Sequence, residues 1–190
     1  MGQYYSGCVL KDNGTTPKAW VYSHDIKYRY KGYDGKYHEC GNGLKLMEHS
    51  YLKNDFVRAF ETLIFENPQR VVWGGDYAKP CKGLKSNVYD RCNDNNKVIP
   101  ENRIGLKQGR YILNISKKMF VDKYKVPKFN DGYQIHPIPL LTCEGNGSGG
   151  GDFWGKDNNK IVGSWARDII SVQGRKPKGF TELIFDLIEE

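Results

Sequence analysis

The sequence predicts an α+β protein, built mainly from antiparallel strands with two or three helices. Short segments rich in Tyr, Val and Trp are separated by turn residues such as Asn13-Gly14, the pattern of β-hairpins. Two other segments carry apolar side chains at helical spacing. Of the 190 residues, 38% are hydrophobic and 27% are charged. This composition supports a folded core and excludes a wholly disordered chain.

Three hairpins are expected. The first joins residues 4–10 and 19–26 across the Asn-Gly turn. The second spans residues 27–37, where basic and aromatic residues alternate around an Asp-Gly pair. The third joins residues 110–115 and 119–124 through a short basic turn.

The remaining segments supply two helices, two strands and one extended piece. Apolar spacing predicts a helix over residues 54–65, and a proline shortly after it ends the helix. A second helix is predicted over residues 180–190. Apolar strands are expected at residues 70–73 and 165–172. The proline-rich segment 135–141 is expected to be an edge strand or an extended connector, because proline interrupts central strands and helices.

The order of these segments repeats in the two halves of the chain. A degenerate duplication would explain the repeat, with two related lobes of about residues 1–77 and 110–172 inside a single domain, 1–190. Residues 78–109 would be an irregular connector, because Gly, Pro, Asn and Lys outnumber apolar residues there. Two such lobes would pack around an approximate two-fold axis.

The closest internal match is a W-small-x-D motif that occurs in both halves. It contains Trp73 and Asp76 in the first half, and Trp165 and Asp168 in the second. The four side chains could line one cleft, in which two carboxylates would act as acid and base or hold a divalent ion. Alternatively, each Trp packs in a core and each Asp caps a turn. Both interpretations stay open at this stage.

The net charge of +7, from 29 Lys and Arg against 22 Asp and Glu, is concentrated in one segment. Residues 1–95 hold 14 bases and 11 acids, and residues 96–190 hold 15 and 11. Between residues 97 and 128, nine bases face only two acids. Such a cluster is either a patch for phosphate or nucleic acid, because bases release counterions from phosphates, or a solvated face.

A glycine-rich loop is the most unusual local feature. Its candidate ligand-binding residues are Gly145, Asn146, Gly147, Ser148, Gly149 and Gly150. Small side chains let backbone N–H groups converge on an anion. The loop formally matches G-x-G-x-x-G, but no βαβ unit surrounds it, and no Gly-Lys-Ser/Thr of a phosphate loop follows. The flanking acids Glu144 and Asp152 would repel a phosphate unless a base or a metal neutralised them, so a simple turn is the alternative.

Other candidate residues are weaker. His49 and His136 precede the glycines of the two halves and could reach one site, or could be structural imidazoles. Tyr28 and Tyr30, which alternate with bases, are typical both of single-strand binding and of a half-exposed hairpin. Metal-ligand spacing is absent from the sequence, and no cofactor is expected.

The five cysteines are scattered, without any C-x-x-C pair, so neither a disulfide framework nor a zinc ribbon is indicated. Reduced thiols in the cytoplasm are expected. No apolar run approaches the length of a membrane span, and the first 20 residues lack the pattern of a secretion signal. Neither a membrane partner nor export is therefore expected.

Several blocks of the chain are similar to those of a known group of proteins. They are the opening MGQYY, GNGLKLMEHS, WGGDYA, IHPIPLLTCEGNGSGGGD and VGSWARD. In combination they resemble an uncharacterised family of short bacterial and phage hypothetical proteins. The resemblance covers roughly a third of the chain, and it implies a small accessory protein, often phage-borne, in the cytoplasm of a bacterial host. The chain departs from the family pattern at residues 27–40 and 78–109.

The leading hypothesis is an accessory protein, with anti-defence activity as one role, that binds a phosphate-bearing nucleotide or nucleic acid. The glycine loop would supply backbone donors, while Lys117, Lys118, Arg167 and the hairpin with Tyr28 and Tyr30 would supply charge and stacking. One alternative is a hydrolase or transferase with an acidic site between the lobes. It would use Asp76, Asp168 and Glu144, and His49 or His136 could join them. Another is an inhibitor that docks on a host protein through the second hairpin.

Overall fold

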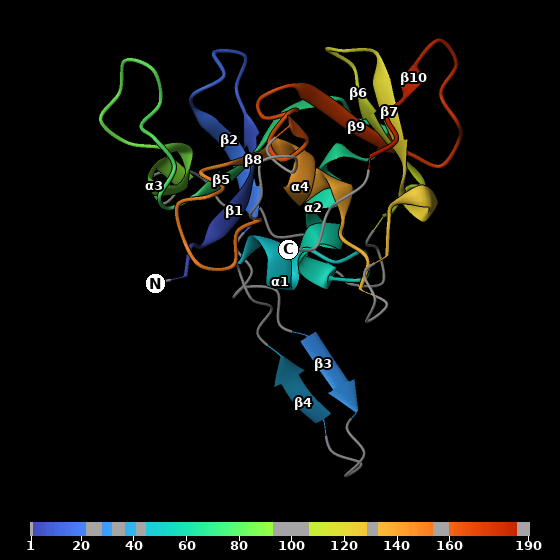
Figure 1. Ribbon diagram of the computed structural model, residues 1–190, viewed down its shortest axis with the longest axis horizontal. Coiled ribbons are helices and arrows are strands. Elements are labelled where there is room, and N and C mark those ends of the chain that lie inside the picture. Colours follow the sequence, from blue (N-terminus) through green and yellow to red (C-terminus); the bar gives the residue numbers. More distant parts are fainter. Residues whose placement is uncertain are drawn as a thin grey trace.

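The computed structural model describes residues 2–21, 45–92, 107–128, 133–153 and 160–185, together with the backbone of 28–31 and 37–40. It shows an α+β fold, as predicted, with one mixed and mostly antiparallel eight-stranded sheet that is covered by short helices (Figure 1). The sheet strands are β1 (Tyr5–Leu10), β2 (Pro17–Val21), β5 (Gln69–Gly75), β6 (Tyr111–Asn114), β7 (Met119–Asp122), β8 (Cys143–Glu144), β9 (Ile169–Gln173) and β10 (Thr181–Glu182).

The strand order is β10-β7-β6-β9-β5-β1-β2, with β8 beside β5. This order is symmetric about the antiparallel β5–β9 pair, because a hairpin lies on each side of it. A duplication would produce such an order. The two W-x-x-D motifs nevertheless differ, since Trp73 lies inside β5 whereas Trp165 lies in turns before β9. The strand expected from residue 165 therefore begins only at Ile169, and the relation of the two halves by duplication stays a prediction.

The main core lies between the sheet and α1 (Leu46–His49), α2 (Asp55–Ile64) and α4 (Pro137–Thr142). The predicted helix over 54–65 is confirmed as α2. Asn54 caps it, because its side-chain oxygen accepts from the Phe56 N–H at 2.8 Å. Phe56 and Phe60 pack on the indole of Trp73, with ring centroids 5.0 and 5.3 Å away. The apolar face of α2 thus fixes β5 at the centre of the sheet.

The other face of the sheet carries a smaller core under α3 (Val88–Cys92). This helix corrects the expectation that the whole segment 78–109 is irregular; residues 93–106 lie outside the described residues. Val88 and Cys92 are buried against Cys8, Trp20 and Val72. The four cysteines whose side chains are described are buried free thiols.

The prediction for residues 135–141 was wrong, because Pro137–Thr142 forms α4. Its prolines occupy the first turn, where an N–H would have no helical partner, so proline costs nothing there. His136 caps the helix through its ring Nδ1, which accepts from the Ile138 N–H at 3.1 Å.

The C-terminal helix predicted over 180–190 was also wrong in its described part. Thr181–Glu182 forms β10, parallel to β7, and Leu183 donates its N–H to the Phe120 carbonyl at 2.8 Å. Burial alternates along this segment, since Ile184 is 77% exposed while Phe185 is buried. The open edge of β7 offers hydrogen-bond partners that an isolated helix would lack. Residues 186–190 lie outside the described residues.

The second predicted hairpin is confirmed in its backbone. β3 (Tyr28–Lys31) and β4 (Tyr37–Cys40) form a separate antiparallel pair, drawn below the main sheet in Figure 1. The side chains of Tyr28 and Tyr30 lie outside the described part, so docking through this hairpin stays a prediction. Within the described ranges, no helix has the length and apolar character needed to cross a membrane.

Candidate functional site

The glycine-rich loop wraps around a carboxylate of the protein itself. Asp152 is fully buried, and its Oδ2 accepts hydrogen bonds from the backbone N–H groups of Gly147, Ser148 and Gly149 at 2.8, 2.9 and 2.9 Å. Its Oδ1 accepts from the Tyr5 hydroxyl at 2.7 Å. Burial, followed by the bond to Asp152, raises the pKa of Tyr5, which keeps this hydroxyl a donor.

The loop therefore has the convergent N–H groups expected of an anion site, but their anion is Asp152. An external phosphate would have to displace this carboxylate to reach them, which corrects the role assigned to the backbone of Gly147, Ser148 and Gly149. Asn146 is structural as well, because its side chain exchanges two hydrogen bonds with the backbone of Phe153, at 2.9 and 2.8 Å.

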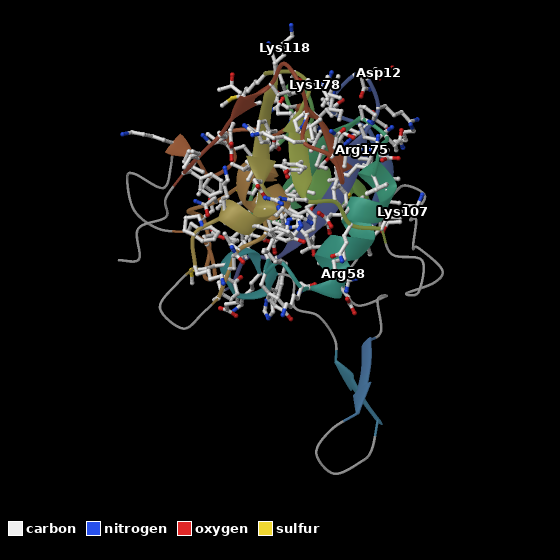
Figure 2. All side chains as sticks on the ribbon, turned by 90° about the vertical axis from the view of Figure 1, so that its right-hand side faces the viewer. Asp12, Arg58, Lys107, Lys118, Arg175 and Lys178 are labelled. Atoms are coloured by element: carbon white, nitrogen blue, oxygen red, sulfur yellow. The ribbon has the colours of Figure 1, made fainter. Side chains whose placement is uncertain are left out.

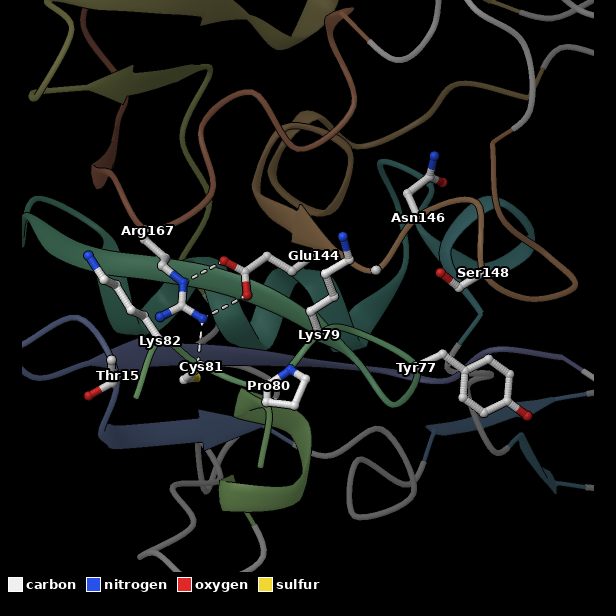
Figure 3. Close-up of a pocket in the computed structure, with 11 residues that line it drawn as sticks. Thr15, Tyr77, Lys79, Pro80, Cys81, Lys82, Glu144, Asn146, Ser148 and Arg167 are labelled. Carbon is white, nitrogen blue, oxygen red and sulfur yellow. Dashed lines mark hydrogen bonds and ion pairs between the residues drawn. The ribbon is translucent and has the colours of Figure 1, made fainter. Parts of the chain in front are cut away.

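A cavity of about 560 Å³ lies beside this loop (Figure 3). Four segments that are distant in the sequence surround it, namely the turn after β1, the loop after β5, the first half of the glycine loop and the turns before β9. Its lining residues are Thr15, Tyr77, Lys79, Pro80, Cys81, Lys82, Glu144, Gly145, Asn146, Ser148 and Arg167.

An ion pair forms one wall of the cavity. The Arg167 Nε and Nη2 atoms lie 2.5 and 2.8 Å from the two Glu144 carboxylate oxygens. Arg167 also donates to the Gly14 carbonyl at 2.6 Å and to the Cys81 Sγ at 3.3 Å. The bonds to Glu144 raise the pKa of Arg167 further above its usual range. The bidentate pair cancels its own charge, and the bonds of Arg167 join its own segment to the segments of Gly14, Cys81 and Glu144.

The backbone of Arg167 is strained in a way that fixes this side chain. Its φ of 65° lies in the left-handed region, which costs about 1–2 kcal/mol for a residue with a Cβ. Two hydrogen bonds hold the conformation. The Arg167 N–H donates to the Val71 carbonyl at 2.7 Å, and the Arg70 Nη1 donates to the Arg167 carbonyl at 2.6 Å. Strain that is held in place at a cavity wall is typical of functional sites.

Two lysines supply the free charge of the cavity. Lys79 and Lys82 are exposed, and among the described residues neither has an acidic partner. In Figure 3, Lys82 lies on the Arg167 side of the ion pair and Lys79 on the Glu144 side. Tyr77, which is 42% exposed, lines the same cavity. The cavity thus offers two unpaired cations and one exposed aromatic ring among its described lining residues.

The W-x-x-D motifs do not form a shared site. Trp73 and Trp165 are both buried. The Asp168 carbonyl accepts from the Val71 N–H, so it lies five residues of strand, about 16 Å, from Asp76. Burial raises the pKa of Asp76, whose Oδ1 accepts from the Tyr4 N–H at 3.1 Å.

The other predicted residues also lie outside the cavity. Asp168 accepts from the Asn114 amide at 2.7 Å and pairs with Lys117 at 3.1 Å. Lys118 is exposed in the turn between β6 and β7. The described part of the chain contains no group of three His, Cys, Asp or Glu side chains that could hold a metal ion.

The histidines do not meet the acidic residues of the enzyme hypothesis. His136 is fully buried, and both its ring nitrogens are engaged, Nδ1 with the Ile138 N–H and Nε2 with the Glu61 Oε1 at 3.1 Å. Burial lowers the pKa of His136 and keeps the ring neutral. His49 is half-buried, and burial lowers its pKa as well. Without a free nitrogen, His136 cannot serve as a general base.

Sequence reasoning missed the residues that supply free groups to the cavity, Tyr77, Lys79 and Lys82. Lys79 and Lys82 belong to segment 78–109, which was expected to be an irregular connector, whereas Tyr77 is the last residue of the first predicted lobe. One signal could have found them, because they directly follow a buried strand, and loops at strand ends often carry binding residues. Arg167 and three loop residues, Gly145, Asn146 and Ser148, were predicted and do line the cavity.

Comparison of the chain with protein-family models, with curated proteins and with solved structures gives no significant match.

Proposed function

We propose that the protein is a binding protein whose cavity takes a phosphate-bearing nucleotide. The proposal rests on Lys79 and Lys82, two exposed lysines that line the cavity beside the Arg167–Glu144 ion pair. With the Arg167–Glu144 pair neutral, Lys79 and Lys82 leave the cavity with a net positive charge. Such a cavity favours an anion, and lysine ammonium groups are common ligands of phosphate.

The remaining lining suits the nucleoside part. Tyr77 offers an exposed ring on which a base can stack. Thr15 and Ser148 supply hydroxyl groups that can bond to a ribose or to base edges. The volume of about 560 Å³ falls inside the usual range for small-molecule sites.

The biological role is part of the same proposal. The resemblance to bacterial and phage proteins implies an accessory role, and we propose that the protein fills it by sequestering or sensing its ligand. Interference with host defence is one such role. The engaged nitrogens of His136 and the separation of Asp76 from Asp168 support binding over catalysis.

The test is a titration of the purified chain with fluorescently labelled ATP, followed by anisotropy. We expect saturable binding that weakens between about 50 mM and about 200 mM salt. Lys79→Ala/Lys82→Ala should lower the affinity at least tenfold. The matched control is Lys53→Ala/Lys107→Ala, which removes the same charge from exposed positions outside the cavity. Equal losses in both variants, or no binding at low salt, would refute the proposal.

A further inference from the structure

A second cavity, of about 510 Å³, opens between α2, the start of β6 and the 3-10 helix η3 (Lys123–Lys125). No described residue that lines the first cavity also lines this one. Its polar lining residues are Lys53, Arg58, Gln108, Arg110, Lys123 and Gln134. Four of these six are cationic, and no acidic residue lines it among the described ones.

The acids that pair with these bases lie behind the cavity wall. Arg58 and Arg110 keep 30% and 44% of their side chains exposed, whereas each partner carboxylate is less than a tenth exposed. The pairs are Arg58–Asp55 at 3.1 Å, Arg110–Asp122 at 2.7 Å and Lys123–Glu61 at 2.5 Å. Asp55 and Asp122 therefore hold Arg58 and Arg110 in position with their guanidinium groups partly exposed, whereas Lys123 is itself buried with Glu61.

The positive surface extends beyond the cavity. Lys107 is held beside α2, because its backbone N–H donates to the Thr62 hydroxyl at 3.0 Å. Arg175 follows β9, which pairs with β6. Figure 2 shows Arg58, Lys107, Arg175 and Lys178 distributed along one face of the molecule. Among the described residues, Lys53, Lys107 and Arg175 have no acidic partner.

An exposed aromatic ring stands at the mouth of the cavity. Tyr124 is 72% exposed, and the Arg110 guanidinium lies 5.1 Å from its ring centroid. Nothing in the core requires this ring, and an exposed Tyr beside an Arg is the usual platform for an unstacked base. The amides of Gln108 and Gln134, which line the same cavity, can bond to base edges.

We propose that this face binds single-stranded nucleic acid. The sugar–phosphate backbone follows Lys53, Arg58, Lys107 and Arg175, and one base stacks on Tyr124 at the cavity mouth. A duplex meets the charges but cannot present a free base without the cost of unpairing it. This proposal rests on the basic face alone and is independent of the nucleotide cavity.

The test uses the full chain and a fluorescein-labelled oligothymidylate of about 12 nucleotides. Four phosphate contacts predict a slope of about −3 for log K against log salt. Lys53→Ala/Lys107→Ala should weaken binding at least tenfold and make the slope shallower by about 1.4, because two contacts are lost. Lys11→Ala/Lys85→Ala, which makes the same charge change at exposed positions outside both cavities, is the matched control and should leave both quantities unchanged.

The base contact is tested separately. Tyr124→Ala removes a mostly exposed ring, so the fold should survive, and affinity for the single strand should fall roughly tenfold with little change in salt slope. The proposal is overturned if the oligothymidylate does not bind at low salt. It is equally overturned if a duplex of the same length or inorganic polyphosphate binds as tightly, since charge alone would then account for the binding.

Discussion

The stability of the glycine loop should depend on Asp152. Replacing Asp152 by Ala leaves the N–H groups of Gly147, Ser148 and Gly149, as well as the Tyr5 hydroxyl, without an acceptor. A hydrogen bond to a charged group contributes about 1.5–3 kcal/mol. Gly147 and Ser148 are exposed, so water replaces part of what is lost. We therefore expect the free energy of unfolding to fall by about 3–5 kcal/mol, which lowers Tm by roughly 6–20 °C at this chain length.

Urea unfolding followed by far-UV circular dichroism measures this loss. Asp152→Asn keeps one oxygen for the three N–H groups and should lose only about half as much. Asp12→Ala, at an exposed turn, is the matched control and should stay within about 0.5 kcal/mol of the parent. Inorganic phosphate should stabilise Asp152→Ala more than the parent, because the three N–H groups can then donate hydrogen bonds to an external anion. A loss below about 1 kcal/mol in Asp152→Ala would refute the reasoning.

Three further predictions concern the first cavity and the core. Glu144→Gln removes the negative charge of the cavity wall, so affinity for labelled ATP should rise several-fold in the same titration; a fall would contradict the proposed charge balance. Burial lowers the pKa of His136, so its contribution to stability is complete above about pH 6.5 and declines as the pH falls below that. His136→Asn keeps the helix cap but loses the bond to Glu61, and its unfolding free energy should change less between pH 6.5 and 5 than that of the parent, although the variant is less stable. Gly7→Ala would place a Cβ 2.3 Å from the Trp73 ring, and chemical denaturation should show a loss of about 1–3 kcal/mol.

The fold was predictable where local signals agree with tertiary structure. Turn residues predict the hairpins, and the apolar spacing over residues 54–65 predicts helix α2, whose apolar face packs against the sheet. The errors arose where the structure of a segment depends on its place in a helix or on an adjacent strand. The two prolines in residues 135–141 argue against a helix unless they lie in its first turn, and the structure places them there. Thr181–Glu182 is a strand because β7 has a free edge, which no local pattern in residues 180–190 reveals.

The site was predictable only in part, for similar reasons. The glycine loop was identified as an anion-binding arrangement, and Asp152 was identified as an acid in the wrong place for phosphate. Only the structure shows that the two features are connected, because the N–H groups of the loop bind the Asp152 carboxylate. The lysines at 79 and 82 become a site only when the glycine loop and Arg167 meet them, and those contacts join residues more than 60 positions apart.

The distribution of buried acids explains why a modest net charge can produce strongly basic surfaces. Asp55, Glu61, Asp122 and Asp152 are all buried, and each binds groups of the protein itself, although the Oε2 atom of Glu61 has no hydrogen-bond partner among the described residues. Their charges are therefore shielded from a ligand, while the exposed bases remain accessible to it. The two cavities share no described lining residue, and their exposed lysines lie on different loops. The effects of charge substitutions in the two cavities on binding free energy should therefore be additive. Additivity would distinguish a nucleotide site and a separate strand-binding face within one chain.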